Sequence, residues 1–252
     1  GLMSALQSPI ARATAKDKTA AKSAAANAAA ASFAALTAKL DYLSTEGLAQ
    51  VRSAYKYADE AHLGQMRNNG EPYITHPLAV ARILADLGIG PVTLAAALLH
   101  DTVEDTDYNL ELLRADFGDE VAMLVDGVTK LDKVKFGDAA QAETVRKMVV
   151  AMSRDIRVLV VKLADRLHNA RTWGFVPVES ARRKAQETIE IYAPIAHRLG
   201  LNQTYRELQE LSFRHLKPWR YAVLSKAVAK ARNRRRDLIQ KVHAELESTF
   251  SK

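Results

Sequence analysis

The sequence predicts an all-α fold, and three observations carry this prediction. Apolar residues recur with a period near ~3.6 in most windows of the chain. No segment alternates cleanly between apolar and polar residues, and no hairpin turn separates two apolar runs. Nearly half of the 252 residues (48%) are hydrophobic, so the chain is long enough to bury a sizeable core. We therefore expect helices packed on helices.

The first third of the chain is expected to hold an extension followed by three helices. Residues 3–40 are rich in alanine, which favours helix but buries little, so they predict a marginal helix or a disordered extension. Residues 46–69 carry apolar positions at helical spacing, and residues 70–73 (GEPY) are a turn. Pro77 suits the first turn of a helix that runs to about residue 87. After a Gly/Pro break, residues 92–103 form a strongly apolar helix.

The rest of the chain repeats the helical period without an internal repeat. Residues 156–172 (IRVLVVKLADRLHNART) begin with β-branched residues like a strand, but their length favours a buried helix. The windows that predict helices are 109–116, 119–130, 142–153, 157–172, 178–192, 202–215 and about 218–248.

Composition excludes several classes of protein. The chain has no cysteine, so disulfides, thiolate metal sites and cysteine nucleophiles are excluded. No apolar run approaches the ~20 residues that a membrane helix needs, and no secretory signal precedes the fold. This composition suits a cytoplasmic protein. Gly1-Leu2 before Met3 resembles a cloning scar, so we expect Met3 to be the natural start of a short, complete gene product.

The most informative segment is LLHDTVEDT, residues 98–106. Adjacent His100 and Asp101 can present one nitrogen and one oxygen to the same metal ion. Glu104 and Asp105 follow about one helical turn later, where they can reach a water bound to that metal. This pattern is typical of a metal-dependent phosphohydrolase.

Two further residues extend the pattern. His76 lies just before Pro77, and Asp165 lies in the middle of an apolar helix. Taken singly, a histidine beside a proline is usually structural, and a lone aspartate is usually a cap, an ion-pair partner or a solvent-facing residue. Together with His100 and Asp101, they offer two nitrogens and two oxygens, and an unpaired Asp165 would be costly among apolar neighbours.

The motifs YITHP, LLHDTVEDT, KLADRLHNART and IYAPIAHRLG occur in this order, and the chain resembles the hydrolase domain of the RelA/SpoT family from about residue 55 to 219. Residues 129–149 are especially similar to the long actinobacterial enzymes. The resemblance implies an all-α, HD-domain helical phosphohydrolase fold in residues 46–217. It leaves residues 1–45 as an extension and residues 218–252 as a basic C-terminal helix. The chain leaves no room for a synthetase domain, so we expect a single-domain small alarmone hydrolase.

The resemblance also implies the chemistry. The expected reaction is hydrolysis of the 3′-diphosphate of guanosine tetra- or pentaphosphate (ppGpp, pppGpp) to GDP or GTP plus pyrophosphate, with Mn²⁺ as the cofactor. The ligands would be His76, His100, Asp101 and Asp165, and the acid/base pair would be Glu104 and Asp105. The residues implied around the nucleotide are Arg67, Tyr73, Asn169, Arg171 and Thr172. Arg166 and Arg171 can equally be surface arginines of an amphipathic helix.

One position departs from the family pattern. Long relatives usually carry a basic residue and a serine after the arginine, whereas this chain has Asn68 and Asn69. The loss of a positive charge beside an anionic nucleotide leaves substrate preference open. Two alternatives therefore remain: an HD phosphohydrolase of another nucleotide, such as an NADPH 2′-phosphatase, or a non-catalytic remnant that binds nucleotide or RNA.

Basic charge is concentrated at the C-terminus. The formal net charge is +7, and residues 214–252 hold eleven Lys/Arg against three Asp/Glu, so the rest of the chain is close to neutral. Such a run is most often a solvated face. A contact with RNA or ribosomes is the alternative. The apolar stripe in this run, Val223, Val228, Leu238, Val242 and Leu246, predicts packing on the body or on a second subunit.

Overall fold

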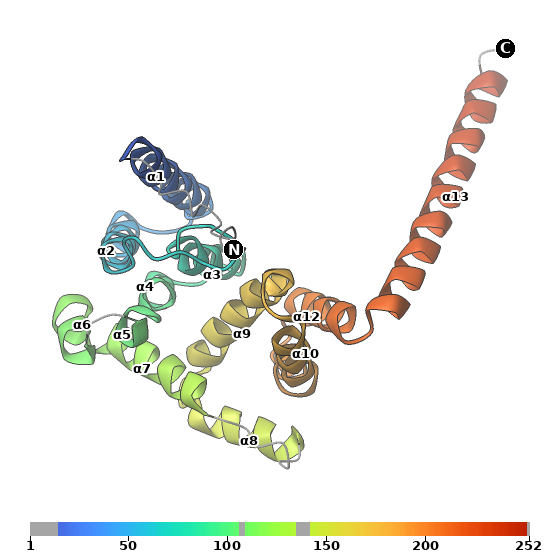
Figure 1. Ribbon diagram of the computed structural model, residues 1–252. Helices are drawn as coiled ribbons and strands as arrows, with labels where there is room; N and C mark the ends of the chain where they lie inside the picture. Colours follow the sequence, from blue (N-terminus) through green and yellow to red (C-terminus); the bar gives the residue numbers. More distant parts are fainter. Residues whose placement is uncertain (1–14, 106–108, 135–141, 251–252) are drawn as a thin grey trace, which may run out of the picture. The chain divides into compact units, whose positions relative to one another are not determined.

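The computed structural model describes residues 15–105, 109–134 and 142–250, and every regular element within these ranges is a helix (Figure 1). This confirms the prediction of an all-α fold. Among the described helices, none has a stretch long and apolar enough to cross a membrane. In chain order the helices are α1 (Ala15–Thr37), α2 (Thr45–Ala61), α3 (Thr75–Asp86), α4 (Pro91–Leu99), α5 (Thr102–Asp105), α6 (Leu110–Phe117), α7 (Asp119–Lys133), α8 (Ala142–Met152), α9 (Ile156–Arg171), η1 (Trp173–Phe175), α10 (Val178–Glu187), η2 (Thr188–Tyr192), α11 (Ala193–Arg198), α12 (Asn202–Leu216) and α13 (Pro218–Phe250).

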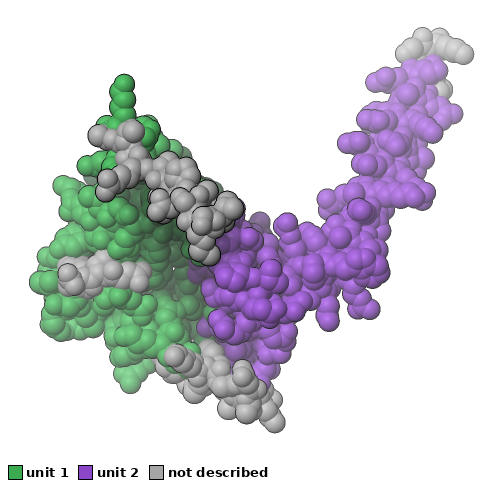
Figure 2. Space-filling view, in the orientation of Figure 1, with its two compact units in different colours: residues 1–135, 149–168 green, residues 136–148, 169–252 purple. Residues whose placement is uncertain are grey.

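The chain divides into two compact units (Figure 2). The first consists of Gly1–Lys135 and Val149–His168, and the second of Phe136–Met148 and Asn169–Lys252. The division therefore passes through α8 and α9.

Helix α4 forms the centre of the first unit. It packs on α2, α3 and α7, and Thr93 to Leu99 are all buried. A helix that is apolar all round must be buried on every side, which explains its place. Because α4 ends at Leu99, His100 and Asp101 follow directly from the most buried helix of the unit.

The alanine-rich segment is a helix that packs on α3. Its few large side chains add contacts: the Phe33 ring stacks on Tyr55 of α2 with centroids 4.0 Å apart, and Leu36 of α1 and Leu40 just after it are buried. Alanine supplies the helix propensity, and these three residues supply the burial that alanine lacks. Residues 1–14, the remainder of the expected extension, lie outside the described residues.

Helices α7 and α9 approach closely in the first unit. A Cβ placed on Gly127 would lie 2.7 Å from a methyl carbon of Val158, so only glycine allows this contact. About one turn further along each helix, Lys162 of α9 meets Asp132 of α7. The close contact thus determines which polar residues of the two helices meet.

The second unit contains one departure from the expected helix at 178–192. Helix α10 ends at Glu187 and continues as the short π-helix η2, which ends two residues before Pro194. Proline cannot donate to the carbonyl four residues back and its ring crowds that carbonyl, so the chain widens by one residue here. The Glu190 carbonyl instead accepts a hydrogen bond from Arg146 Nη1 at 2.7 Å.

Candidate metal centre

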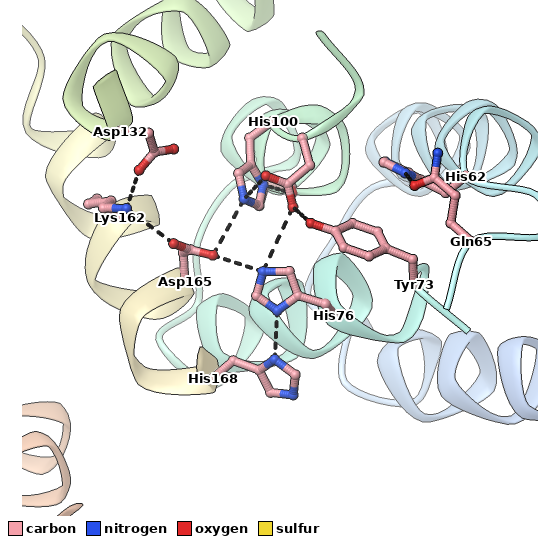
Figure 3. Close-up of polar contacts among 11 residues, drawn as sticks. His62, Gln65, Tyr73, His76, His100, Asp132, Lys162, Asp165 and His168 are labelled. Atoms are coloured by element: carbon pink, nitrogen blue, oxygen red, sulfur yellow. Dashed lines mark hydrogen bonds and ion pairs between the residues drawn. The ribbon is translucent and has the colours of Figure 1, made fainter. Parts of the chain in front are cut away.

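Four side chains of the first unit converge around a common point: Figure 3 shows His76, His100 and Asp165 directed towards one another, and Asp101 lies beside both histidines. His76 comes from the first turn of α3, His100 and Asp101 from the end of α4, and Asp165 from the middle of α9. His76 Nε2 lies 2.8 Å from Asp165 Oδ1, and His100 Nε2 lies 3.1 Å from Asp101 Oδ1 and 3.5 Å from Asp165 Oδ1. Donor atoms of His76, His100 and Asp101 all lie within 4.8 Å of one another.

The second nitrogen of each histidine ring is held by the protein. His100 Nδ1 lies 2.6 Å from the Ala97 carbonyl, which can only accept, so Nδ1 carries the proton. His76 Nδ1 lies 2.7 Å from His168 Nδ1. If His76 is the donor there, both rings present an unprotonated Nε2 to the centre. This is the tautomer in which histidine binds a metal.

His100 Nε2 tests whether these residues fit a divalent cation. It is buried and makes no hydrogen bond within the described part of the chain, although two carboxylate oxygens face it. A nitrogen lone pair that faces carboxylate oxygens is repulsive unless a proton or a metal cation lies between them, so this position binds one or the other. Two imidazoles and two carboxylates are also a donor set that divalent metals accept. The residues therefore fit a divalent metal ion.

The pKa values show the same electrostatic field. Burial of the His100 ring opposes its protonation, but Asp101 and Asp165 outweigh burial and raise the pKa of His100 to about 10. Burial likewise works against the charged form of Asp165, yet Lys162 and the two histidines hold its pKa well below the usual range. The centre therefore attracts positive charge strongly.

Each carboxylate also has a partner outside the four converging residues. The Tyr73 hydroxyl donates to Asp101 Oδ2 at 2.8 Å, and Lys162 Nζ lies 3.3 Å from Asp165 Oδ2. Lys162 is buried and also contacts Asp132 at very short range. Sequence reasoning missed Lys162, Asp132 and His168. Lys162 and His168 lie three residues on either side of Asp165, so helical spacing was the available signal.

The loop before α3 carries Arg67 and Tyr73. The Arg67 backbone N–H donates to the Glu71 carbonyl at 2.8 Å, and Gly70 takes a positive φ of 83°, so the segment is a tight turn. Asn69 Oδ1 accepts from the Glu71 N–H at 3.1 Å, which assigns Asn69 to the turn, whereas Asn68 is exposed.

The remaining predicted residues are only partly described. Glu104 is exposed on the short helix α5, and the side chain of Asp105 lies outside the described residues. Asn169, Arg171 and Thr172 belong to the second unit. There Arg171 forms a two-pronged ion pair with Glu207 at 2.6 and 2.9 Å, and the Thr172 hydroxyl donates to the Asn169 carbonyl.

Curated relatives are similar to this chain over most of its length. A GTP pyrophosphokinase of Streptomyces coelicolor is 58% identical over 205 residues, which is 81% of this chain and 24% of the relative. A guanosine-3′,5′-bis(diphosphate) 3′-pyrophosphohydrolase of Vibrio cholerae is 54% identical over 209 residues, or 82% of this chain and 30% of the relative. The chain thus spans less than a third of the length of these relatives.

A solved structure is similar over nearly its whole length. It is described as a metazoan ortholog of SpoT that hydrolyzes ppGpp; the TM-score is 0.53 at 26% identity, over 70% of this chain and 98% of that chain. The HD domain family matches residues 54–202, a range that holds all four converging side chains. The chain belongs to the HD domain family.

Proposed function

We propose that this protein is a Mn²⁺-dependent 3′-pyrophosphohydrolase of guanosine tetra- and pentaphosphate. The observation that carries the proposal is the convergence of His76, His100, Asp101 and Asp165, with a buried His100 Nε2 that faces two carboxylate oxygens. These four residues would hold the ion. When bound, it would lower the pKa of a water molecule and neutralise charge on the phosphoryl oxygens.

Comparison with the relatives supports hydrolysis rather than synthesis. Some relatives are named for a kinase activity, but this chain matches only about a quarter of their length. The metazoan ortholog described as hydrolyzing ppGpp is matched over 98% of its chain. A relative of similar extent is thus described as hydrolyzing ppGpp.

The chain's own residues have three tasks in this proposal. Glu104 and Asp105, one turn after the proposed ligand Asp101, take the proton from the attacking water and return one to the leaving group. Arg67 binds phosphate from the turn before α3. The family resemblance also implies nucleotide-binding roles for Tyr73 and for Asn169, Arg171 and Thr172. Tyr73 has a second task, because its hydroxyl already holds Asp101.

The test is incubation of the purified chain with ppGpp and Mn²⁺, with and without chelator, while GDP and pyrophosphate are followed. We expect both products in equal amounts and only with the metal. A parallel assay offers NADPH and other phosphorylated nucleotides. Turnover of NADPH alone would favour the 2′-phosphatase alternative. Metal binding without any turnover would favour the nucleotide-binding remnant.

A further inference from the structure

Behind the centre lies a buried ion pair that the proposed reaction does not use. Lys162 is only 6% exposed and lies between Asp132 of α7 and Asp165 of the same helix, α9. Figure 3 shows these residues as a continuous row that leads from Asp132 to the two histidines. A buried lysine is costly unless its charge is matched, so this arrangement requires an explanation.

Lys162 acts on one oxygen of Asp165 only. Its Nζ lies 3.3 Å from Oδ2, whereas Oδ1 of the same carboxylate lies 2.8 Å from His76 Nε2 and 3.5 Å from His100 Nε2. One oxygen of the carboxylate thereby faces the two histidines, and the other contacts Lys162. Lys162 thereby opposes a turn of Oδ2 towards a bound cation, in which the carboxylate would occupy two positions around the ion.

Asp132 makes this arrangement electrostatically neutral. A lone Lys162 would add a positive charge beside the centre and would weaken its attraction for a cation. Asp132 contacts Lys162 directly with a side chain that is 22% exposed, and its negative charge offsets that of the lysine. The contact of Gly127 with Val158, about one turn earlier along both helices, holds the two partners at this distance.

We propose that Lys162, held by Asp132, is a positioning residue that limits Asp165 to one oxygen at the metal. A position around the ion then stays open for water or for a substrate phosphate. The inference rests on the proposed function for its consequence in turnover, but its effect on metal binding stands apart from any substrate. A pair that served only to hold the fold would stabilise α7 against α9 and would leave metal affinity unchanged.

The test compares Lys162→Met and Asp132→Asn with Lys130→Met in the full chain. Lys130 is a matched control, because it pairs with Asp126 on the exposed side of α7. Calorimetry gives the affinity of the metal-free protein for Mn²⁺, and the visible absorption of bound Co²⁺ reports the number of ligands. We expect Lys162→Met to shift the Co²⁺ spectrum towards a higher number of ligands and to strengthen Mn²⁺ binding about two- to ten-fold, because it removes the restraint on Asp165 Oδ2 and a positive charge beside the centre. Asp132→Asn leaves the charge of Lys162 unmatched and should weaken Mn²⁺ binding about 10-fold, and Lys130→Met should leave it unchanged.

Turnover of ppGpp separates this inference from the proposed function. In Lys162→Met, with saturating Mn²⁺, kcat should fall while KM stays near the wild-type value. Wild-type affinity and an unchanged Co²⁺ spectrum in both variants would overturn the inference, even if their melting temperatures fall. If Lys162→Met does not fold, wild-type Mn²⁺ affinity and an unchanged Co²⁺ spectrum in Asp132→Asn alone would overturn the inference. A wild-type chain that binds Mn²⁺ but leaves ppGpp intact would refute the proposed function alone.

Discussion

The chain holds two dense groups of charged residues, and they are built in opposite ways. In the first unit, the centre formed by His76, His100, Asp101 and Asp165 is buried, and each of these side chains is held by a partner behind it. In α13, residues 226–241 carry seven Lys/Arg against Asp237, and all of them are exposed.

The two groups differ in the free-energy cost of removing their charges from water. An exposed charge keeps its hydration, so a run of lysines and arginines on a helix needs no partner to be tolerated. A buried charge loses its hydration and must be matched by its surroundings. A buried polar group that is fully matched except at one point, as at His100 Nε2, is therefore stronger evidence of a site than a larger exposed cluster.

The largest effect is expected from Asp101→Ala. The change removes a proposed ligand whose side chain is 14% exposed, so the fold should survive while turnover of ppGpp falls about 10³-fold or more. Asp41→Ala, in an exposed turn, is the control and should leave turnover unchanged. Circular dichroism checks the fold, and the product assay checks the rate. Persistent activity in Asp101→Ala would show that the metal assignment is wrong.

Tyr73→Phe tests whether a residue that contacts a proposed ligand contributes to metal affinity. Removal of the hydroxyl releases Asp101 Oδ2, so Mn²⁺ affinity should fall about 10- to 100-fold. If Tyr73 acts only on substrate, KM for ppGpp rises and Mn²⁺ affinity stays constant. Tyr42→Phe is the matched control, because its hydroxyl also donates one hydrogen bond, to the Ile89 carbonyl, at an exposed place.

Asn68→Lys tests the loop that departs from the family pattern. Asn69 takes part in the turn, whereas Asn68 is exposed and can be replaced without loss of a described contact. If the loop contacts phosphate, the added charge should strengthen ppGpp binding about two- to five-fold, and less at high salt. Asn68→Gln is the neutral control. Unchanged affinity in Asn68→Lys would remove this loop from the phosphate site.

Arg171 distinguishes a substrate contact from a surface ion pair. Its pair with Glu207 is partly exposed, so Arg171→Ala should lower the free energy of unfolding by only about 0.2–1 kcal/mol. Glu207→Gln should change stability by a similar amount. A rise in KM in Arg171→Ala but not in Glu207→Gln would support the nucleotide contact, while equal KM values in both would support the surface pair.

The contrast between buried and exposed charge also explains which helices and site residues the sequence predicts. Helical periodicity predicts α4 and α9 because burial leaves a pattern along the chain, and His100, Asp101 and Asp165 could be chosen because polar groups interrupt it. Lys162 interrupts the same apolar helix but was passed over, because lysine is usually solvated and its partner Asp132 lies thirty residues away. The π-helix η2 depends on the hydrogen bond that Arg146 donates to the Glu190 carbonyl from another helix, and periodicity along one helix does not contain that contact.

The smallest effect is expected from deletion of residues 226–252. The hydroxyl of Tyr221 donates to Glu210 at 3.1 Å and anchors the first turn of α13 on α12, but the side chains from Ala222 to Ser248 are exposed. The apolar stripe at Val223, Val228 and Leu238 is exposed with them, so the structure gives no support to packing on the body. The melting temperature should therefore change by no more than about 2 °C.

Light scattering measures the molar mass and so tests whether α13 packs on a second subunit. A dimer that becomes a monomer on deletion would support that packing. If molar mass, solubility and ppGpp turnover stay unchanged, the charges of α13 are a solvated surface that does not contribute to the buried centre.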